Sequence, residues 1–197
     1  MKSTNTNCID GMNGLERGVK RIGDVVGAVL LMIILSPLFF WIYVKQKLSS
    51  SGPVIYSQER IGKGGKPFRI VDAEKDGKPM LEQSDDPRLT PFGKYLRKRH
   101  LDELPQIWNV LKGDMSFVGY RPERQYFIDK IMEQNPDYEL LYQTYPGVTS
   151  MATIENGYTD TMEKMLKRLD MDLDYVRNRN LLLDAEIIVK TLAGVFA

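Results

Sequence analysis

The longest hydrophobic stretch of the chain is an uncharged run from Val25 to Val44, VVGAVLLMIILSPLFFWIYV. As a helix, its 20 residues would span about 30 Å, which is close to the thickness of a bilayer core. The run is longer than the apolar core of a signal peptide, and no small-residue cleavage pattern follows it, so a secretory signal is rejected. The pattern therefore predicts contact with a membrane.

Ser36 and Pro37 interrupt this run and predict a kink. Proline removes a backbone donor and clashes with the preceding turn, while a serine hydroxyl can bond a freed carbonyl. Bases flank the run on both sides: Arg17, Lys20 and Arg21 before it, and Lys45 and Lys47 after it. A spanning helix usually carries more Lys and Arg on its cytoplasmic side, and this run shows little such difference. We favour a re-entrant helix-break-helix over residues 25–47, because it keeps these bases among anionic headgroups on the cytoplasmic side. A kinked single-pass anchor is the alternative.

The pattern after residue 50 predicts a β-hairpin and a short helix. Two β-prone runs, PVIYSQERIG and KPFRI, flank Gly62-Lys63-Gly64-Gly65, which is typical of a hairpin. Residues 71–91 are polar and rich in turn formers. A stripe at helical spacing predicts a helix that begins near Leu101 and stops at Gly113, with Pro105 tolerated in its first turns. Its apolar positions are Leu101, Leu104, Ile107, Trp108 and Leu111.

The last third of the chain is predicted to be helical. Residues 125–141 form one helical candidate, and residues 181–195 form an apolar-rich closing helix. Between them, apolar residues that recur alternately four and three positions apart predict a helix that packs on a core. They are Met162, Leu166, Leu169, Leu173 and Val176. Core packing explains such stripes best, although amphipathic helices can also lie at a lipid surface. The predicted fold class is therefore α+β and mostly helical.

Composition and charge narrow the classes of function. With 197 residues and 43% hydrophobic content, the chain can form one domain with a core. The 27 Lys and Arg residues nearly balance the 26 Asp and Glu residues, so the global charge gives no reason to expect nucleic-acid binding. The chain has one cysteine, Cys8, and one histidine, which excludes an intrachain disulfide and a Cys/His zinc site. The cysteine content suits a reducing compartment.

Candidate chemistry is concentrated in RHLDELPQ, where Asp102 and Glu103 follow the basic cluster Arg97-Lys98-Arg99. A carboxylate can attack phosphorus if the charge of the phosphoryl group is neutralised. The cations and a helix N-terminus would keep Asp102 ionised and attract an anionic substrate, and Mg²⁺ held by one or both acids would complete the neutralisation. On a regular helix the two acids would point about 100° apart, so one could attack while the other positions metal or solvent.

Simpler interpretations exist for the same residues. Acids in the first turn of a helix are favourable there without any catalytic role. A lone histidine such as His100 is more often a cap or a surface residue than a general base.

The acidic pair belongs to a longer block, LDELPQIWNVLKGDMSFVGYRPE, from Leu101 to Glu123. This block resembles the signature of the bacterial sugar transferase family, the monotopic polyprenyl-phosphate phosphoglycosyl transferases. The resemblance extends, in the family's order, through the Ser36-Pro37 segment and the stretches 52–70, 89–98 and 146–150.

This resemblance implies a reaction, which is the transfer of a sugar 1-phosphate from a UDP-sugar to polyprenyl (undecaprenyl) phosphate. UMP is released, and the product initiates bacterial glycan or exopolysaccharide assembly. The resemblance implies that Asp102 is the nucleophile of a covalent phosphosugar intermediate and that Glu103 is its partner at a Mg²⁺ site. It further implies that Arg97 and Arg121 contact substrate phosphates, for which a forked guanidinium is well suited. Two successive displacements predict ping-pong kinetics.

The resemblance also implies an architecture and a location. We expect a monotopic protein on the cytoplasmic face of the bacterial inner membrane, with a re-entrant helix broken at Ser36 and Pro37, a small β-hairpin and amphipathic interfacial helices. The expected divisions are a basic N-terminal segment (1–24), the membrane helix-break-helix (25–47) and a catalytic domain (48–197). The expected partners are the UDP-sugar, polyprenyl phosphate and membrane lipids, without nucleic acid; a homo-oligomer is left open.

The chain departs from the family pattern at several positions. Ile70 runs directly into Val71-Asp72-Ala73-Glu74, where the family continues with a strand segment that carries two further bases. Tyr120 stands at the usual proline of Gly-Pro-Arg-Pro, and Thr144-Tyr145 replaces the usual Leu/Val-Arg before Pro-Gly. Each change removes positive charge or rigidity near the expected phosphate site. The alternative function is therefore a catalytically impaired homologue that acts as a membrane-docked scaffold or binding protein.

Overall fold

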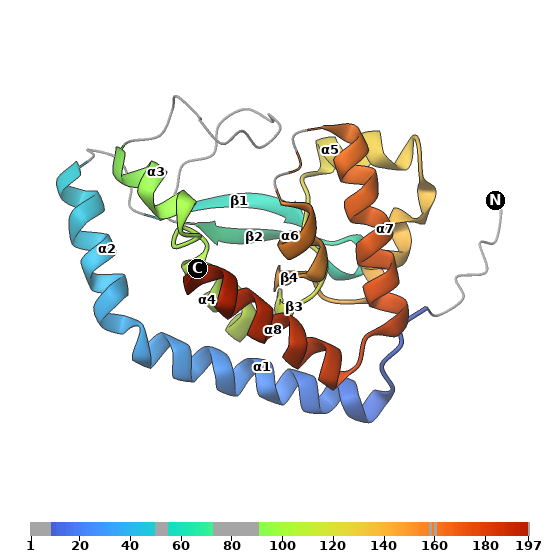
Figure 1. Cartoon of the computed structure of the whole chain (residues 1–197), viewed down its shortest axis with the longest axis horizontal. Coiled ribbons are helices and arrows are strands. Elements are labelled where there is room, and N and C mark those ends of the chain that lie inside the picture. Colours follow the sequence, from blue (N-terminus) through green and yellow to red (C-terminus); the bar gives the residue numbers. More distant parts are fainter. Residues whose placement is uncertain (1–8, 50–54, 73–90, 158, 160, 197) are drawn as a thin grey trace.

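The computed structural model describes residues 9–49, 55–72, 91–157, 159 and 161–196 (Figure 1). The α-helices are α1 (Gly14–Ile34), α2 (Ser36–Ser49), α3 (Pro91–Lys98), α4 (Ile107–Lys112), α5 (Gln125–Met132), α6 (Met151–Asn156), α7 (Met162–Asn178) and α8 (Leu181–Phe196). The strands are β1 (Tyr56–Ile61), β2 (Pro67–Asp72), β3 (Ser116–Val118) and β4 (Gly147–Thr149), and short 3₁₀ helices are η1 (Lys63–Gly65), η2 (Leu104–Gln106) and η3 (Pro136–Gln143). The mostly helical α+β class is confirmed.

Helices α1 and α2 form a bent pair, which confirms the predicted kink. The capping box of Asn13 and Glu16 begins α1, which runs without a break across residues 24 and 25 and ends at Leu35. The Ser36 hydroxyl donates to the Ile33 carbonyl at 2.8 Å, and α2 leaves at an angle of 60° to α1. Among the described residues no single helix is long and apolar enough to cross a bilayer, whereas the bent pair passes that test of length and composition together. Figure 1 shows α1 along the base of the molecule and α2 along one side.

Polar residues of α1 join this helix to the rest of the fold. Asp24 is buried and accepts hydrogen bonds from the Ser116 hydroxyl at 2.8 Å and from the Phe117 N–H at 3.2 Å. The Arg21 guanidinium donates to the Val110 carbonyl at 2.8 Å and to the Leu111 carbonyl at 3.2 Å, near the C-terminus of α4. Such terminal carbonyls have no partner within their own helix and attract a cation.

Lys20 forms an ion pair with Asp184 of α8. The expectation that all five flanking bases lie among lipid headgroups is therefore wrong for Lys20 and Arg21. Both side chains bind the protein because α1 packs lengthwise against it.

The predicted hairpin is confirmed. Strands β1 and β2 pair antiparallel from Tyr56 opposite Asp72 to Ile61 opposite Pro67. Gly64 and Gly65 in the turn have φ values of 72° and 67°, a region that favours glycine. The periodicity did not indicate β3 and β4, which pair parallel and are three residues long each. The turn-rich residues 73–90 lie outside the described residues.

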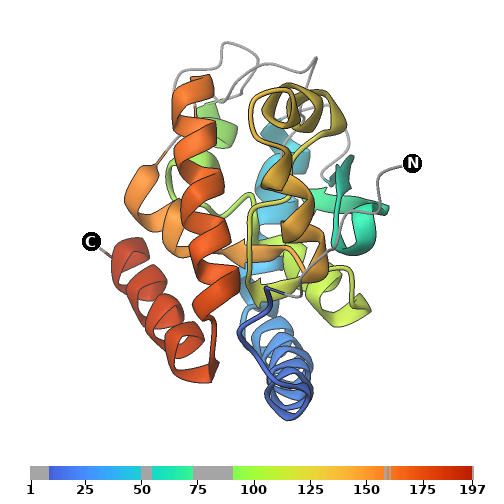
Figure 2. The ribbon, with the colours of Figure 1, turned by 90° about the vertical axis from the view of Figure 1, so that its right-hand side faces the viewer.

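Helix α7 contributes a row of buried residues to the larger hydrophobic cluster of the core. Leu169, Leu173 and Val176 of α7 are buried, and Met162 and Leu166 pack partly buried against the same cluster, so the predicted stripe is confirmed. The closing helix is confirmed as α8. Figure 2 shows α7 running the height of the domain above α1.

The single helix predicted over residues 125–141 is wrong. Helix α5 ends at Met132, and the chain continues as η3 from Pro136. A proline ring clashes with the preceding turn and lacks a backbone donor, so it cannot continue an α-helix from α5.

Candidate active site

Asp102 and Glu103 lie in the bend that joins α3 to η2. At the end of α3 the Leu101 N–H donates to the Leu96 carbonyl at 2.9 Å, and His100 adopts a left-handed φ of 53°. The chain thus turns sharply just before the acidic pair. His100 is exposed, as expected of a surface residue.

The helix predicted from Leu101 begins later, as η2 at Leu104 followed by α4 at Ile107. Its start is therefore wrong, because the residue before Pro105 is restricted and the proline supplies no donor to a preceding turn. The predicted stop is confirmed, since Gly113 caps α4 with a φ of 98°. Trp108 of the predicted stripe is 53% exposed and does not belong to the core.

Asp102 is largely buried, with 9% of its surface exposed. Burial, and then the charge of Glu103, raise the pKa of Asp102 to about 6, although its own backbone N–H, His100 and Arg121 oppose the rise. Loss of water thus outweighs the nearby cations, on which the expectation of an ionised Asp102 rested. The carboxylate form still predominates at neutral pH, and a more basic carboxylate is a better nucleophile.

One oxygen of this carboxylate is left unpaired by the fold. Within the described part of the chain, Oδ1 of Asp102 is buried and has no hydrogen-bond partner. An unpaired buried acceptor costs roughly 1–3 kcal/mol, and such atoms are found where a ligand, an ion or a reaction uses them.

Arg121 is brought to the acidic pair from the segment that follows β3. Its Nη1 donates to Oε1 of Glu103 at 3.1 Å, and both side chains are mostly buried. The structure thus joins two of the residues that the sequence singled out for phosphate chemistry. Arg97 is half-buried in the last turn of α3, five residues before Asp102 in the sequence. Its contact with a phosphate stays a prediction.

A buried polar network that the sequence analysis missed lies behind Arg121. Glu123 pairs with Arg168 of α7 at 3.2 Å and with Arg60 of β1 at 3.5 Å, and so it ties the hairpin to the core helix. Arg168 also donates to the Gly157 carbonyl at 3.1 Å. These buried ion pairs fix the positions of β1, the segment that contains Glu123, and α7 relative to one another.

Asp172 completes this network. Burial raises the pKa of Asp172 to about 7, against the lowering effects of the Arg168 charge, the Arg121 backbone and the Ser150 side chain. A cavity with room for about one water molecule is bordered by Arg121, Glu123, Arg168 and Asp172. The available signal was the position of Arg168 and Asp172, one turn apart on one flank of the apolar stripe of α7.

The acidic pair fits a magnesium ion only in part. No group of three or more His, Cys, Asp or Glu side chains that could hold a metal is present in the ranges that the structure describes. Mg²⁺ at phosphate-transfer sites, however, uses one or two carboxylates and completes its shell with water and substrate phosphates. Asp102, with its unpaired Oδ1, and Glu103 match that donor set.

Comparison with known proteins shows the family of the chain. The family model described as bacterial sugar transferase matches residues 15–197. The chain belongs to this family. It is 39% identical, over 92% of its length, to the UDP-glucose:undecaprenyl-phosphate glucose-1-phosphate transferase of Escherichia coli K12, of which it covers 41%. It is 38% identical, over 90%, to the UDP-N-acetylgalactosamine-undecaprenyl-phosphate N-acetylgalactosaminephosphotransferase of Aeromonas hydrophila, of which it covers 43%.

Relatives of different length match the same part of the chain. A UDP-glucose:undecaprenyl-phosphate glucose-1-phosphate transferase of Caulobacter vibrioides is 39% identical over 89% of this chain, which covers 69% of that protein. The chain spans about two fifths of the length of the E. coli and Aeromonas relatives.

The departures from the bacterial sugar transferase pattern have structural explanations at two positions. Tyr120 is fully buried in the core rather than directed at the acidic pair, and burial raises the pKa of its hydroxyl. A β-bridge to Pro146 and a hydrogen bond from the Gly147 N–H at 2.8 Å hold its backbone. Tyr145 receives the Lys63 ammonium over its ring at 4.1 Å from the centroid. A base from the hairpin turn thus lies where the family's arginine is missing.

Proposed function

We propose that this protein transfers a sugar 1-phosphate from a UDP-sugar to undecaprenyl phosphate and releases UMP. Family membership supports the general reaction, and the relatives' names supply both substrate classes. The observation that carries the proposal is the buried Asp102 carboxylate, whose Oδ1 is unpaired beside the Glu103–Arg121 ion pair. This arrangement combines a nucleophile with a cation for the phosphate.

In the first step a carboxylate oxygen of Asp102 attacks the sugar-bearing phosphorus of the UDP-sugar. The new O–P bond forms as the bridging P–O bond of the diphosphate breaks, and UMP leaves. In the second step an oxygen of polyprenyl phosphate attacks the same phosphorus, and the bond to Asp102 breaks. The product is a polyprenyl-diphosphate sugar, and the Asp102 carboxylate is restored, so atoms and charges balance.

The other residues of the site bind and orient. Arg121 stabilises the negative charge of the phosphoryl group, and its ion pair to Glu103 fixes the direction of its fork. Arg97 approaches from α3 as a second phosphate contact. Mg²⁺ held by Asp102 and Glu103 would supply further neutralisation of the diphosphate.

We place the protein on the cytoplasmic face of the bacterial inner membrane, held in one leaflet by the α1–α2 pair. The 60° bend supports a shallow entry, because two limbs that share the bend equally are each inclined by about 30° to the membrane plane. The stretch from Val25 to Ile34 is about 15 Å long and would then reach a depth of about 8 Å, within one leaflet. Exposed apolar residues of α8 support an additional interfacial contact; they are Leu182, Val189 and Leu192.

The reaction is tested by incubating the full chain in nanodiscs with undecaprenyl phosphate, Mg²⁺ and a panel of UDP-sugars, and by measuring UMP. We expect UMP with at least one sugar, an adduct of sugar phosphate on Asp102 by mass spectrometry, and no UMP from Asp102→Asn. If a folded, membrane-bound protein releases no UMP with any sugar, the scaffold alternative replaces this proposal.

The topology is tested separately through Cys8, the single cysteine of the chain. A membrane-impermeant maleimide added to intact cells should leave Cys8 unlabelled and should label it after the membrane is opened. Labelling in intact cells would contradict the one-leaflet arrangement and favour a spanning pair.

A further inference from the structure

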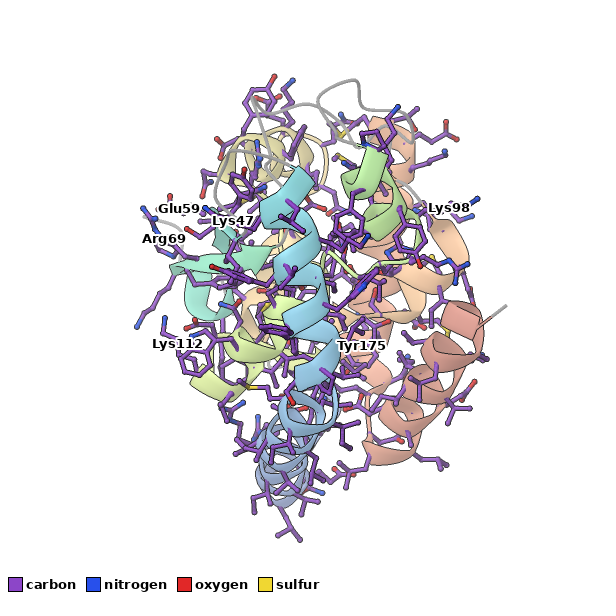
Figure 3. All side chains as sticks on the ribbon, turned by 90° about the vertical axis from the view of Figure 1, so that its left-hand side faces the viewer. Lys47, Glu59, Arg69, Lys98, Lys112 and Tyr175 are labelled. Carbon is purple, nitrogen blue, oxygen red and sulfur yellow. The ribbon has the colours of Figure 1, made fainter. Side chains whose placement is uncertain are left out.

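Aromatic side chains connect the membrane pair to the helix that leads into the acidic bend. Trp41 of α2 meets Phe92 of α3 edge to face, with ring centroids 5.6 Å apart. Phe92 in turn stacks on Tyr95 at 6.2 Å, and the Arg99 guanidinium lies 5.9 Å from the Tyr95 ring centroid. We call Trp41, Phe92 and Tyr95 the aromatic track. Figure 3 shows α3 beside the upper half of α2.

The track has one end on α2 and the other end on α3, the helix that leads into the acidic bend. Trp41 lies one turn beyond Pro37, and Arg99 is followed within three residues by Asp102. Trp41 remains 41% exposed and Tyr95 45% exposed, so both rings present an open apolar surface. These exposed rings offer an apolar path from bilayer depth to the site.

The charge along α3 complements a lipid phosphate. Residues 91–100 carry the bases Lys94, Arg97, Lys98 and Arg99 and no acidic residue. A phosphate that travels with an apolar chain would meet these bases where the track ends, and the flat rings would bury the unsaturated groups next to the phosphate. A water-soluble nucleotide sugar has no such chain and gains nothing from the track.

We propose that the aromatic track binds the first isoprene units of the polyprenyl phosphate acceptor and guides its phosphate to the bases of α3. This inference rests on the proposed function and adds to it a subsite for the acceptor. It predicts that the two substrates depend on different surfaces, since UMP release from the donor needs only the acidic bend and its arginines.

The experiment compares Trp41→Leu and Phe92→Leu with Phe40→Leu as the control, each in the full chain in nanodiscs. Phe40 neighbours Trp41 in α2 and is 70% exposed, so it shares any role in membrane anchoring but lies outside the track. Donors are UDP-glucose and UDP-N-acetylgalactosamine. We expect the KM for undecaprenyl phosphate to rise about tenfold in both track variants, which corresponds to the loss of about one buried apolar contact. The KM should stay unchanged in Phe40→Leu.

The first half-reaction separates binding of the acceptor from general damage. A single burst of UMP from the donor without acceptor should keep its rate and amplitude in the track variants. Equal effects of all three substitutions on the KM for undecaprenyl phosphate would overturn the proposal, because these aromatic residues would then only anchor the protein in the membrane. An impaired burst would overturn it as well, because the track would then serve the fold of the site.

A binding measurement keeps the test independent of turnover. A diazirine-bearing farnesyl phosphate should crosslink to residues 91–96 or to Trp41 in the Asp102→Asn protein, and Trp41→Leu should weaken this crosslink. If wild-type protein gives no UMP but the crosslink is found there, the proposed reaction fails while the acceptor subsite stands. A crosslink confined to other segments overturns the subsite itself.

Discussion

The guanidinium of Arg121 donates to the carboxylate of Glu103 at 3.1 Å, across eighteen residues of sequence. This ion pair joins the acidic bend before η2 to the segment after β3, and the same Arg121 borders a small cavity together with Asp172 inside the domain. One residue therefore links the surface of the site to the buried network behind it.

Replacing Arg121 with lysine should impair the reaction even though the charge is kept. Lysine cannot hold Glu103 and a phosphate through one planar fork. We expect kcat/KM for UMP release to fall roughly 10- to 100-fold, the equivalent of about 1.5–3 kcal/mol for hydrogen bonds to charged groups. The control is Arg124→Lys, because Arg124 donates to Gln58 at 3.0 Å, away from the acidic pair. Equal losses in both variants would argue against the role of Arg121.

The reaction should lose rate in acid through Asp102. Its pKa of about 6 lies above the ordinary value, so the reactive carboxylate form is depleted as the pH falls through about 6. The measurement is kcat/KM for UMP release against pH, which reports groups of the free enzyme. Glu103→Gln removes the second cause of the raised pKa and should move the acidic limb to lower pH. An acidic limb that stays in place in this variant would assign it to another group.

Magnesium should be required, and Glu103 should set the concentration that is needed. A chelator should suppress UMP release, and added Mg²⁺ should restore it. In Glu103→Gln the concentration of Mg²⁺ for half-maximal rate should rise about tenfold or more, because a neutral amide is a poorer ligand than a carboxylate. Full activity in the presence of chelator would contradict a metal site at the acidic pair.

Asp172→Asn should change the pH dependence of stability. Burial raises the pKa of Asp172 from 3.8 to about 7, so the folded state binds the proton more tightly than the unfolded state. The stability contributed by this group is fully present below about pH 4 and is lost as the pH rises through about 7. Asparagine imitates the protonated acid at every pH, so the Tm of the variant relative to wild type should increase between pH 5 and pH 8, by roughly 2–4 °C for each kcal/mol.

The matched control for this experiment is Asp170→Asn. Asp170 is an exposed residue of the same helix, and its substitution should leave the Tm difference independent of pH. A flat difference for Asp172→Asn as well would mean that its charge is compensated in the fold.

Asp184→Ala should loosen the attachment of α1. Asp184 accepts from the Tyr175 hydroxyl at 2.6 Å and pairs with Lys20. Its loss leaves the mostly buried Lys20 ammonium without this partner, while the Tyr175 hydroxyl keeps its hydrogen bond to the Val118 carbonyl at 3.4 Å. We expect unfolding to become about 2–4 kcal/mol easier, as measured by thermal or chemical denaturation in detergent. Glu186→Ala on the same helix removes an exposed pair with Lys190 and should leave the midpoint unchanged. Equal midpoints for the two variants would show that the buried pair does not secure α1.

Much of the fold could be predicted from local patterns. The apolar run, the break at Ser36 and Pro37, the glycine turn of the hairpin and the stripe of α7 all depend on side chains within a few residues of one another, and these were confirmed. The family signature singled out Asp102, Glu103 and Arg121, and the structure pairs Glu103 with Arg121, while their roles in the reaction stay predictions. By contrast, the helix predicted from Leu101 begins later in the structure. The hydrogen bond that ends α3 and the restricted backbone before Pro105 outweigh the helical spacing of the apolar residues.

What the sequence by itself determined is therefore the break at Ser36 and Pro37, the hairpin of β1 and β2, and the stripe of α7, since periodicity and turn chemistry are properties of neighbouring residues. Only the tertiary structure decided that Lys20 and Arg21 bind protein rather than lipid, that Glu123 joins β1 to α7, and that Asp102 is buried enough for its pKa to rise. The physical reason is that desolvation and long-range ion pairs depend on which segments meet in space, and no local pattern in the sequence carries that information.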